Sequence, residues 1–117
     1  MTEQVNRKYE FVEGDTINID GAALNRIRAV KDFHGVNKGD LGGYIEKEEN
    51  LSHEGDCWVG DRAKVYGDSR VYEDALVCGE AKVRGEAQVY GDAKVCCRAK
   101  VSQNAQLCGD IAVTDCY

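Results

Sequence analysis

From residue 57 onward, apolar and polar positions repeat every six residues. Valine recurs at this interval, with leucine at one position: Val59, Val65, Val71, Val77, Val83, Val89, Val95, Val101, Leu107 and Val113. Two residues before each of these stands a mostly small residue: Cys57, Ala63, Ser69, Ala75, Ala81, Ala87, Ala93, Ala99, Ala105 and Ile111. So many consecutive matches at two positions predict an array of one repeated structural unit.

Each six-residue unit is predicted to be a very short strand followed by a bend. Ala63-Lys64-Val65 alternates between inward and outward side chains, as a strand does. The following Tyr66-Gly67-Asp68 has turn chemistry, because glycine accepts a positive φ and aspartate hydrogen-bonds to nearby backbone. One unit cannot bury a face alone. The units are therefore expected to wind into coils, each pairing with the next.

This arrangement resembles the hexapeptide-repeat family, in which an aliphatic residue is followed four positions later by a small one and three units close a triangular coil. The match is strict over residues 57–117. The resemblance implies a left-handed parallel β-helix, an exception to the usual right-handed crossover. We therefore predict an all-β fold, a triangular prism of about four coils over residues 41–117.

The repeat is expected to extend backward in phase toward the N-terminus. This stretch contains Leu41-Gly42-Gly43-Tyr44-Ile45-Glu46 and Leu51, although Lys47 and His53 fall where aliphatic residues should stand. The pattern Gly-Asp-Leu-Gly-Gly-Tyr-Ile-Glu at 39–46, followed by Glu-Asn-Leu-Ser at 49–52 and by Trp58-Val59, resembles a group of short, mostly uncharacterised bacterial and phage proteins. Those proteins carry the repeat behind a small N-terminal segment. The resemblance implies the same order in this chain.

The first forty residues break the period and carry the signals of a small β-unit. Alternation at Lys8–Val12, Thr16–Ile19 and Arg26–Val30 predicts two or three strands, separated by turn sequences at Glu13–Asp15 and Asp20-Gly21. A solenoid needs a cap over its first coil, which otherwise exposes core and unpaired backbone. Residues 1–40 are therefore predicted to be an N-terminal β cap.

The alternative for this segment is a separate binding module. Arg26, Arg28 and Lys31 could contact an acidic partner from one face of a strand. Three spaced charges are more typical of a solvated face.

Composition and charge limit the classes of partner. Leu, Ile, Val and Phe number only 25 of 117 residues, which the repeat explains because alanine and serine fill its small core positions. The chain carries 15 Lys+Arg against 21 Asp+Glu, a net charge of −6. This balance argues against direct binding of nucleic acid or an anionic membrane. No run is apolar enough for a membrane span or secretory signal, so a cytoplasmic location is expected, in a bacterial host if the chain is phage-encoded.

The cysteines are expected to be reduced thiols. They are Cys57, Cys78, Cys96, Cys97, Cys108 and Cys116, and their spacing contains no C-x-x-C motif. No zinc site is therefore predicted.

Outward side chains are expected to form ladders. If three units close a coil, residues 18 positions apart stack about 4.8 Å apart along the axis. Tyr72, Tyr90 and Cys108 then share one column, and Cys78 lies over Cys96. Exposed aromatic ladders favour a protein interface; stacking that stabilises the solenoid itself is the alternative. The candidate partner-binding residues are Trp58, Tyr66, Tyr72, Tyr90, Asp74, Asp92 and Asp110.

Two of these ladders have more than one interpretation. For Asp74, Asp92 and Asp110, which form a column at one corner, turn chemistry repeated in each coil is the plainer one. A cation site on those carboxylates is the alternative. Cys78 and Cys96 could approach disulfide distance, but in-register neighbours in parallel strands are poorly oriented for a bond, so thiols are expected.

The last coil is expected either to plug its own end or to pair with a second copy. Leu107 and Ile111 stand where smaller residues stand elsewhere, and with Tyr117 they are the candidate oligomer-end residues. We expect a homo-oligomer, either a dimer or a trimer; trimers are common among the hexapeptide relatives.

Many hexapeptide-repeat proteins are acyltransferases, which implies a general base, usually histidine, in a cleft between subunits. The chain has His34, in a loop, and His53, at the irregular first coil, and both are expected to be exposed loop residues. No insertion interrupts residues 57–117 to shape a cofactor site. No catalytic residue, cofactor or metal is therefore predicted.

The leading functional hypothesis is a non-enzymatic interaction protein, a rigid acidic β-helix that binds a protein partner with a basic surface. Its specific form is a phage-type inhibitor of a host defence or nucleic-acid-binding factor, since an acidic rod can compete for a basic groove. The alternatives are an acyltransferase-like enzyme or a degenerate relative, and a structural spacer.

Overall fold

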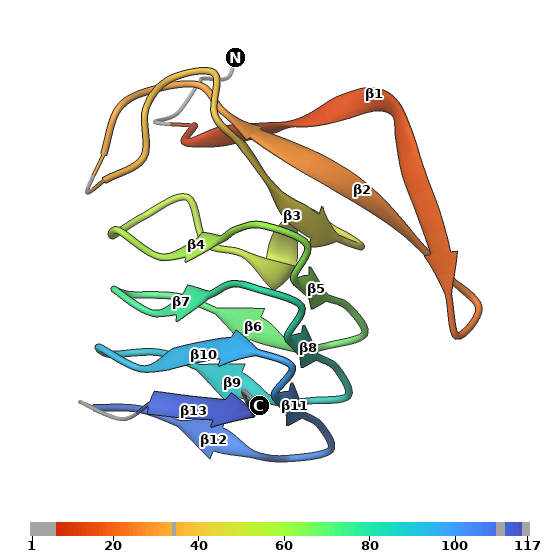
Figure 1. Ribbon diagram of the computed structural model, residues 1–117, viewed down its shortest axis with the longest axis vertical. Helices are drawn as coiled ribbons and strands as arrows, with labels where there is room; N and C mark the ends of the chain where they lie inside the picture. Colours follow the sequence, from red (N-terminus) through yellow and green to blue (C-terminus); the bar gives the residue numbers. More distant parts are fainter. Residues whose placement is uncertain (1–6, 34, 110–111, 116–117) are drawn as a thin grey trace.

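The backbone forms about four stacked triangular coils beneath a β-hairpin (Figure 1). The computed structural model describes residues 7–33, 35–109 and 112–115. In these residues the helical content is one short 3₁₀ helix, η1 (Glu48–Asn50), so no helix is long and apolar enough to span a membrane. The architecture is therefore an all-β solenoid, as the repeat predicts.

Three parallel sheets make the sides of the prism. The cap face contains β3 (Leu41–Ile45), β5 (Lys64–Val65), β8 (Lys82–Val83) and β11 (Lys100–Val101). The tyrosine face contains β6 (Arg70–Val71), β9 (Gln88–Val89) and β12 (Gln106–Leu107). The cysteine face contains β4 (Trp58–Val59), β7 (Leu76–Val77), β10 (Lys94–Cys97) and β13 (Ala112–Asp115).

The register confirms the coil length of 18 residues. Lys64 pairs with Lys82, and Lys82 pairs with Lys100. The amide of Lys64 donates to the Ala81 carbonyl oxygen at 2.9 Å, and the amide of Lys82 donates to that of Ala99 at 3.0 Å. Each coil thus donates its amides to the coil that follows it. The parallel sheets are consistent with a left-handed β-helix.

The interior of the prism is filled by the repeat residues. The valines at positions 65, 77, 83, 89 and 95 and the alanines at 63, 75, 81, 87 and 93 are all completely buried. Each side of a coil contributes one valine and one alanine or serine to the interior. These side chains are enough to fill a narrow prism at the packing density of a protein core. The low content of large apolar residues is therefore a property of this core rather than a sign of disorder.

The corners of the coils use carboxylates to hold the next coil. The amide of Gly79 donates to Asp61 Oδ2, and the amide of Gly91 donates to Glu73 Oε1, each at 3.0 Å. Both glycines have positive φ, 65° and 68°, which is the backbone conformation that glycine adopts without strain. The bend after each short strand is confirmed.

The first coil does not continue the repeat in the expected phase. Ile45 pairs with Val65 and Leu51 with Val71, whereas Val59 pairs with Val77, so this coil is two residues longer than the next. Ile45 and Leu51 are completely buried, while Leu41 is 50% exposed. The in-phase extension is wrong because burying Ile45 and Leu51 fixes the register, and the loop before β4 absorbs the two extra residues.

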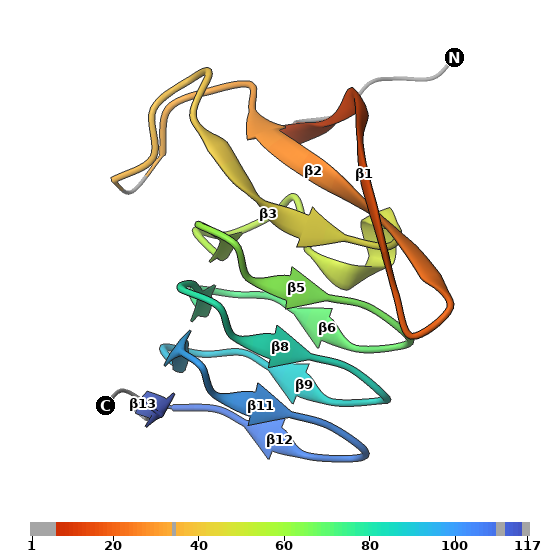
Figure 2. The ribbon, with the colours of Figure 1, turned by 45° about the vertical axis from the view of Figure 1, so that its right-hand side comes forward.

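The N-terminal segment is an antiparallel hairpin of β1 (Tyr9–Ile19) and β2 (Ala22–Ala29), joined at Asp20-Gly21. Strand β2 also pairs antiparallel with β3, so the hairpin extends the cap face beyond the first coil. Figure 2 shows its far end descending beside the coils. The turn expected at Glu13–Asp15 is wrong: this stretch is a register shift inside one continuous strand, which bends β1 instead of reversing it.

Buried polar groups bind the first coil to the second. The Asn50 side chain accepts the amides of Glu46 and Lys47 at 3.0 and 2.9 Å, and donates to the carbonyls of Gly67 and Ser69 at 3.2 and 2.9 Å. Its amide is completely buried and fully hydrogen-bonded. Asn50 therefore takes the place of backbone pairing where the coil is irregular.

Candidate protein-interaction surface

Two tyrosine rings stack on the tyrosine face. Tyr72 and Tyr90 follow β6 and β9, and their rings lie 4.9 Å apart between centroids with an interplanar angle of 5°. Both side chains are half-buried, and the Tyr72 hydroxyl donates to Gln88 Oε1 at 3.1 Å. Burial raises the pKa of Tyr72, and the hydrogen bond with Cys108 raises the pKa of Tyr90, so both phenols are neutral near pH 7. The column expected from the 18-residue spacing is confirmed.

A hollow of about 430 Å³ lies beside the Tyr72 ring. Its floor and walls come from η1, the loop that follows it, β6 and β9. The lining residues are Glu48, Glu49, Leu51, Ser52, His53, Arg70, Val71, Tyr72 and Gln88. We call this hollow, together with Tyr90, the tyrosine groove. It joins an aromatic wall to charged groups of both signs.

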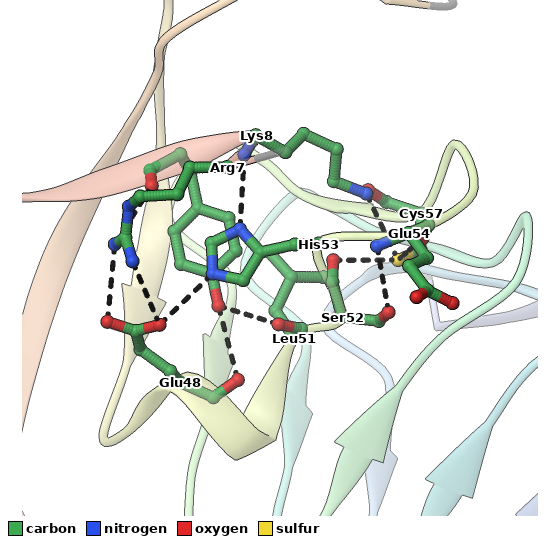
Figure 3. Close-up of polar contacts among 9 residues, drawn as sticks. Arg7, Lys8, Glu48, Leu51, Ser52, His53, Glu54 and Cys57 are labelled. Atoms are coloured by element: carbon green, nitrogen blue, oxygen red, sulfur yellow. Dashed lines mark hydrogen bonds and ion pairs between the residues drawn. The ribbon is translucent and has the colours of Figure 1, made fainter. Parts of the chain in front are cut away.

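His53 is held in place at the edge of the groove (Figure 3). Its Nδ1 accepts the Lys8 backbone amide at 3.1 Å, and its Nε2 lies 3.1 Å from Glu48 Oε1. The ring stacks on Tyr9 with centroids 4.1 Å apart. Burial lowers the pKa of His53, so the ring is neutral at pH 7 and carries its proton on Nε2. Both ring nitrogens are therefore engaged, and neither has a free lone pair for a substrate proton.

The expectation that His53 is an exposed loop residue is wrong, because its side chain is only 22% exposed. The stack on Tyr9 covers one face of its ring. His34 lies outside the described residues.

The residues around His53 connect the N-terminal strand to the first coil. Tyr9 is completely buried, and its hydroxyl donates to the Leu51 carbonyl oxygen at 2.6 Å. Arg7 forms an ion pair with Glu48 at 3.2 Å. Burial raises the pKa of Glu48, but the hydrogen bonds from Arg7 and His53 outweigh it and lower that pKa overall. This cluster orders the rim of the tyrosine groove.

Lys8 and Cys57 form a second buried contact beneath this cluster. The Lys8 ammonium donates to the carbonyls of Cys57 and Gly55 at 2.7 and 3.2 Å and lies 3.3 Å from Cys57 Sγ. Burial lowers the pKa of Lys8 and raises the pKa of the Cys57 thiol. Cys57 occupies a core position, as expected, and its sulfur contacts Lys8 and backbone oxygens rather than His53. The groups needed for Cys-His catalysis are therefore not paired.

Two expected interaction residues lie under the cap. Trp58 is 5% exposed and packs edge-on against Phe33, with ring centroids 5.3 Å apart. Tyr66 is also 5% exposed, because the hairpin covers it and its hydroxyl donates to Asp20 Oδ2 at 2.8 Å. Neither ring is open to a partner in this conformation.

The other expected residues are distributed as follows. Asp74 and Asp92 are exposed, and Asp74 accepts the Asp56 amide at 3.3 Å, which fits turn chemistry. Within the described residues, no three His, Cys, Asp or Glu side chains are grouped to hold a metal ion. Leu107 is half-buried and packs against the core of the last coil. Asp110, Ile111 and Tyr117 lie outside the described residues.

The candidate arginines Arg26 and Arg28 have partners inside the molecule. Arg28 forms an ion pair with Glu10, and Arg26 donates to the Gly42 carbonyl oxygen at 2.9 Å while lying over the Tyr44 ring. The Arg28 contact joins the two strands of the hairpin, and the Arg26 contacts join the hairpin to β3.

Among the described cysteines, the thiol state differs from expectation at Cys97. Cys57, Cys78, Cys96 and Cys108 are free thiols, but Cys97 is disulfide-bonded. Cys97 has a positive φ of 61° and stands at the corner against Gly79, so it leaves the column that Cys96 shares with Cys78. The expectation of thiols throughout is therefore wrong for Cys97.

Sequence reasoning found the two tyrosines of the groove but missed Glu49, Arg70 and Gln88. The last two occupy outward positions next to the tyrosine column, so the 18-residue spacing could have placed them. No sequence signal placed Glu49, because it belongs to the irregular coil.

Comparisons with known proteins reach part of the chain. No family model matches it. A segment is 34% identical over 64 residues to the uncharacterized acetyltransferase YdcK of Escherichia coli (strain K12), which covers 49% of this chain and 20% of that protein. The chain thus spans about one fifth of the length of the curated relative that it matches. The similarity and the solenoid together fit a hexapeptide-repeat β-helix.

Proposed function

We propose that this chain is a non-enzymatic protein-interaction module that binds its partner in the tyrosine groove. The observation that carries the proposal is the stacked Tyr72–Tyr90 pair beside a hollow of about 430 Å³. Tyrosine supplies a large amphipathic contact at low conformational cost, since only two side-chain torsions must be ordered. Aromatic residues next to a pocket are typical centres of binding energy.

The charge of the chain defines the kind of partner. The net charge is −6, and Glu49 at the groove is exposed, with no ion-pair partner among the described residues. A partner with a basic surface would pair with such carboxylates and associate faster at low salt. An inhibitor of a phage type, which occupies the basic groove of a host defence or nucleic-acid-binding factor, is the specific form of this proposal.

The solenoid favours binding without rearrangement. Every side of the prism is hydrogen-bonded from coil to coil, and His53, Tyr9 and Glu48 order the rim of the groove. A preformed surface loses little conformational entropy when a partner binds.

An acyltransferase-like activity is the second candidate, favoured by the partial similarity to the acetyltransferase YdcK. Its general base would have to be a histidine or an equivalent group. In the described structure His53 would first have to release either the Lys8 amide or Glu48. This geometry favours the interaction module over the enzyme.

The test compares Tyr72→Ala/Tyr90→Ala with Gln106→Ala, a control on the same face whose side chain is exposed. A stoichiometric partner is captured with the wild-type chain, and its affinity for each variant is measured by calorimetry at two salt concentrations. We expect the double variant to bind at least tenfold more weakly, the control to bind normally, and added salt to weaken binding.

Equal affinity of the wild type and the double variant would overturn the groove as the binding surface. Binding of acetyl-CoA that is lost in His53→Ala would favour the enzyme. A chain that binds neither a protein nor acetyl-CoA would leave the structural spacer as the better description.

A further inference from the structure

Two free thiols meet on the cysteine face. Cys78 follows β7, and Cys96 lies in β10, one coil farther along the chain. The pairs before them, Leu76 with Lys94 and Val77 with Val95, place the two cysteines in register. Their Sγ atoms lie 2.7 Å apart.

The backbone allows these sulfurs to bond. Strands in a sheet lie about 4.8 Å apart, which falls within the Cα separation of about 4.4–6.8 Å that disulfides span. A disulfide bond measures about 2.05 Å, so closing the gap takes a side-chain movement of under about 1 Å. The side chains therefore converge despite the unfavourable orientation expected for parallel neighbours.

The pair is reachable from solvent. Both cysteines are half-buried, and Cys78 lines a hollow of about 390 Å³ together with Trp58, Asp61 and Leu76. Burial and the neighbouring Cys96 raise the pKa of Cys78 to about 12, so it rests as a thiol rather than a thiolate. Small oxidants can enter this hollow, whereas Cys57 is completely buried.

We propose that Cys78 and Cys96 are a redox-active dithiol site that a small peroxide or a low-molecular-weight disulfide converts into a disulfide between the second and third coils. With a hydroperoxide, the Cys96 thiol loses its proton and its sulfur attacks the peroxide, because the raised pKa of Cys78 disfavours the Cys78 thiolate. The S–O bond forms, the O–O bond breaks, and one water or alcohol leaves.

The second thiol then attacks the sulfenic sulfur. The S–S bond forms, the S–O bond breaks, and water leaves with the second thiol proton. Two electrons pass from the two sulfurs to the peroxide. With a small disulfide, exchange through a mixed disulfide gives the same product and two small thiols.

The product would close a loop one coil long. Such a cross-link reduces the freedom of the unfolded chain and so opposes separation of the two coils. The Cys78 amide donates to the Val95 carbonyl oxygen at 2.8 Å. The disulfide would keep this neighbouring hydrogen bond from opening.

The test uses the full chain after mild reduction, treated with hydrogen peroxide or oxidised glutathione. The protein is then alkylated under denaturing conditions and mapped by peptide mass spectrometry. We expect the oxidised wild type to take up two fewer alkyl groups than the same chain before oxidation. Peptide mapping should show a cross-link between Cys78 and Cys96. Its midpoint of thermal unfolding should rise by several degrees and return on reduction.

Cys108→Ser is the matched control, because Cys108 is an exposed free thiol on the tyrosine face, and it should retain the cross-link. Cys96→Ser should lose both the cross-link and the rise in unfolding midpoint. Cys78→Ser, which removes the other sulfur of the pair, should lose both as well. Alkylation of both Cys78 and Cys96 in the treated wild type would overturn the proposal, and so would a cross-link that joins either of them to another cysteine.

Discussion

Protonation of His53 links the stability of the first coil to pH. Burial lowers its pKa below the ordinary value of 6.5. Between these two pKa values, His53 is protonated in the unfolded chain and neutral in the folded chain. The free energy of unfolding should therefore fall as the pH drops from 6.5 toward the lowered pKa, by at most about 1.4 kcal/mol per pH unit. Denaturant unfolding between pH 5 and 7.5 measures this slope.

The matched variant is His53→Gln, which removes the titration but keeps an amide that can hydrogen-bond. Its stability should vary less over the same pH range. Glu48 acts in a separate window: its lowered pKa gives stability that is lost as the pH falls below 4.5. A wild type and a His53→Gln variant with the same slope above pH 5 would contradict the role of His53.

Residues in regular coils were predictable, and those in the irregular coil were not. The stack of Tyr72 on Tyr90 follows from a spacing that can be counted in the sequence. Asn50 and Lys8 are buried polar residues whose partners are backbone oxygens and amides, and no pattern of side-chain types reveals such partners. His53 belongs to the same group.

At the scale of the elements, Gly43 lies tightly against the second coil. A Cβ atom there would collide with the Ala63 carbonyl oxygen and lie 2.9 Å from Val59 Cγ1. Gly43→Ala should therefore lower the free energy of unfolding by about 1–3 kcal/mol through overpacking. Urea unfolding followed by circular dichroism measures the change.

Gly60→Ala is the matched control, because its added methyl would meet Trp58 Cδ1 at an ordinary 3.4 Å. This variant should unfold close to the wild type. An unchanged midpoint for Gly43→Ala would show that the first coil can shift away from the second, and would contradict the tight packing.

The strands of the coils could be derived from the sequence because one pattern is repeated many times, whereas the cap presents each signal once. Glu13–Asp15 has the composition of a turn, yet pairing of β1 with β2 continues beyond it, and the bend becomes a bulge. The predicted phase of the repeat in the first coil was wrong for a similar reason. Tertiary burial of Ile45 and Leu51 outweighed the local spacing.

At the scale of the whole molecule, we propose that the last coil joins a second copy. In the first three coils, amides such as that of Lys82 donate to the next coil along the chain. In the described chain no strand pairs with the far side of β11, which contains Lys100. An unpaired edge of this kind favours pairing with another chain. Light scattering at micromolar concentration should give the mass of a dimer or trimer.

Leu107→Lys places a charge at this edge and should shift the chain toward a monomer. Gln106→Lys is the control, because that side chain already points to solvent and should leave association unchanged. A wild-type mass equal to one chain would refute self-association at this concentration.

The hairpin reaches farther down the stack than a cap over one coil requires. Asp20, at its tip, accepts the Tyr66 hydroxyl of the second coil and lies 3.9 Å from Arg84 of the third. The hairpin therefore connects the first three coils. These coils cannot separate one at a time from the N-terminal side, because the contacts of Asp20 with Tyr66 and Arg84 must break together. The molecule therefore has a built-in direction of unravelling, beginning at the C-terminal coil, and hydrogen exchange should become slower step by step toward the hairpin.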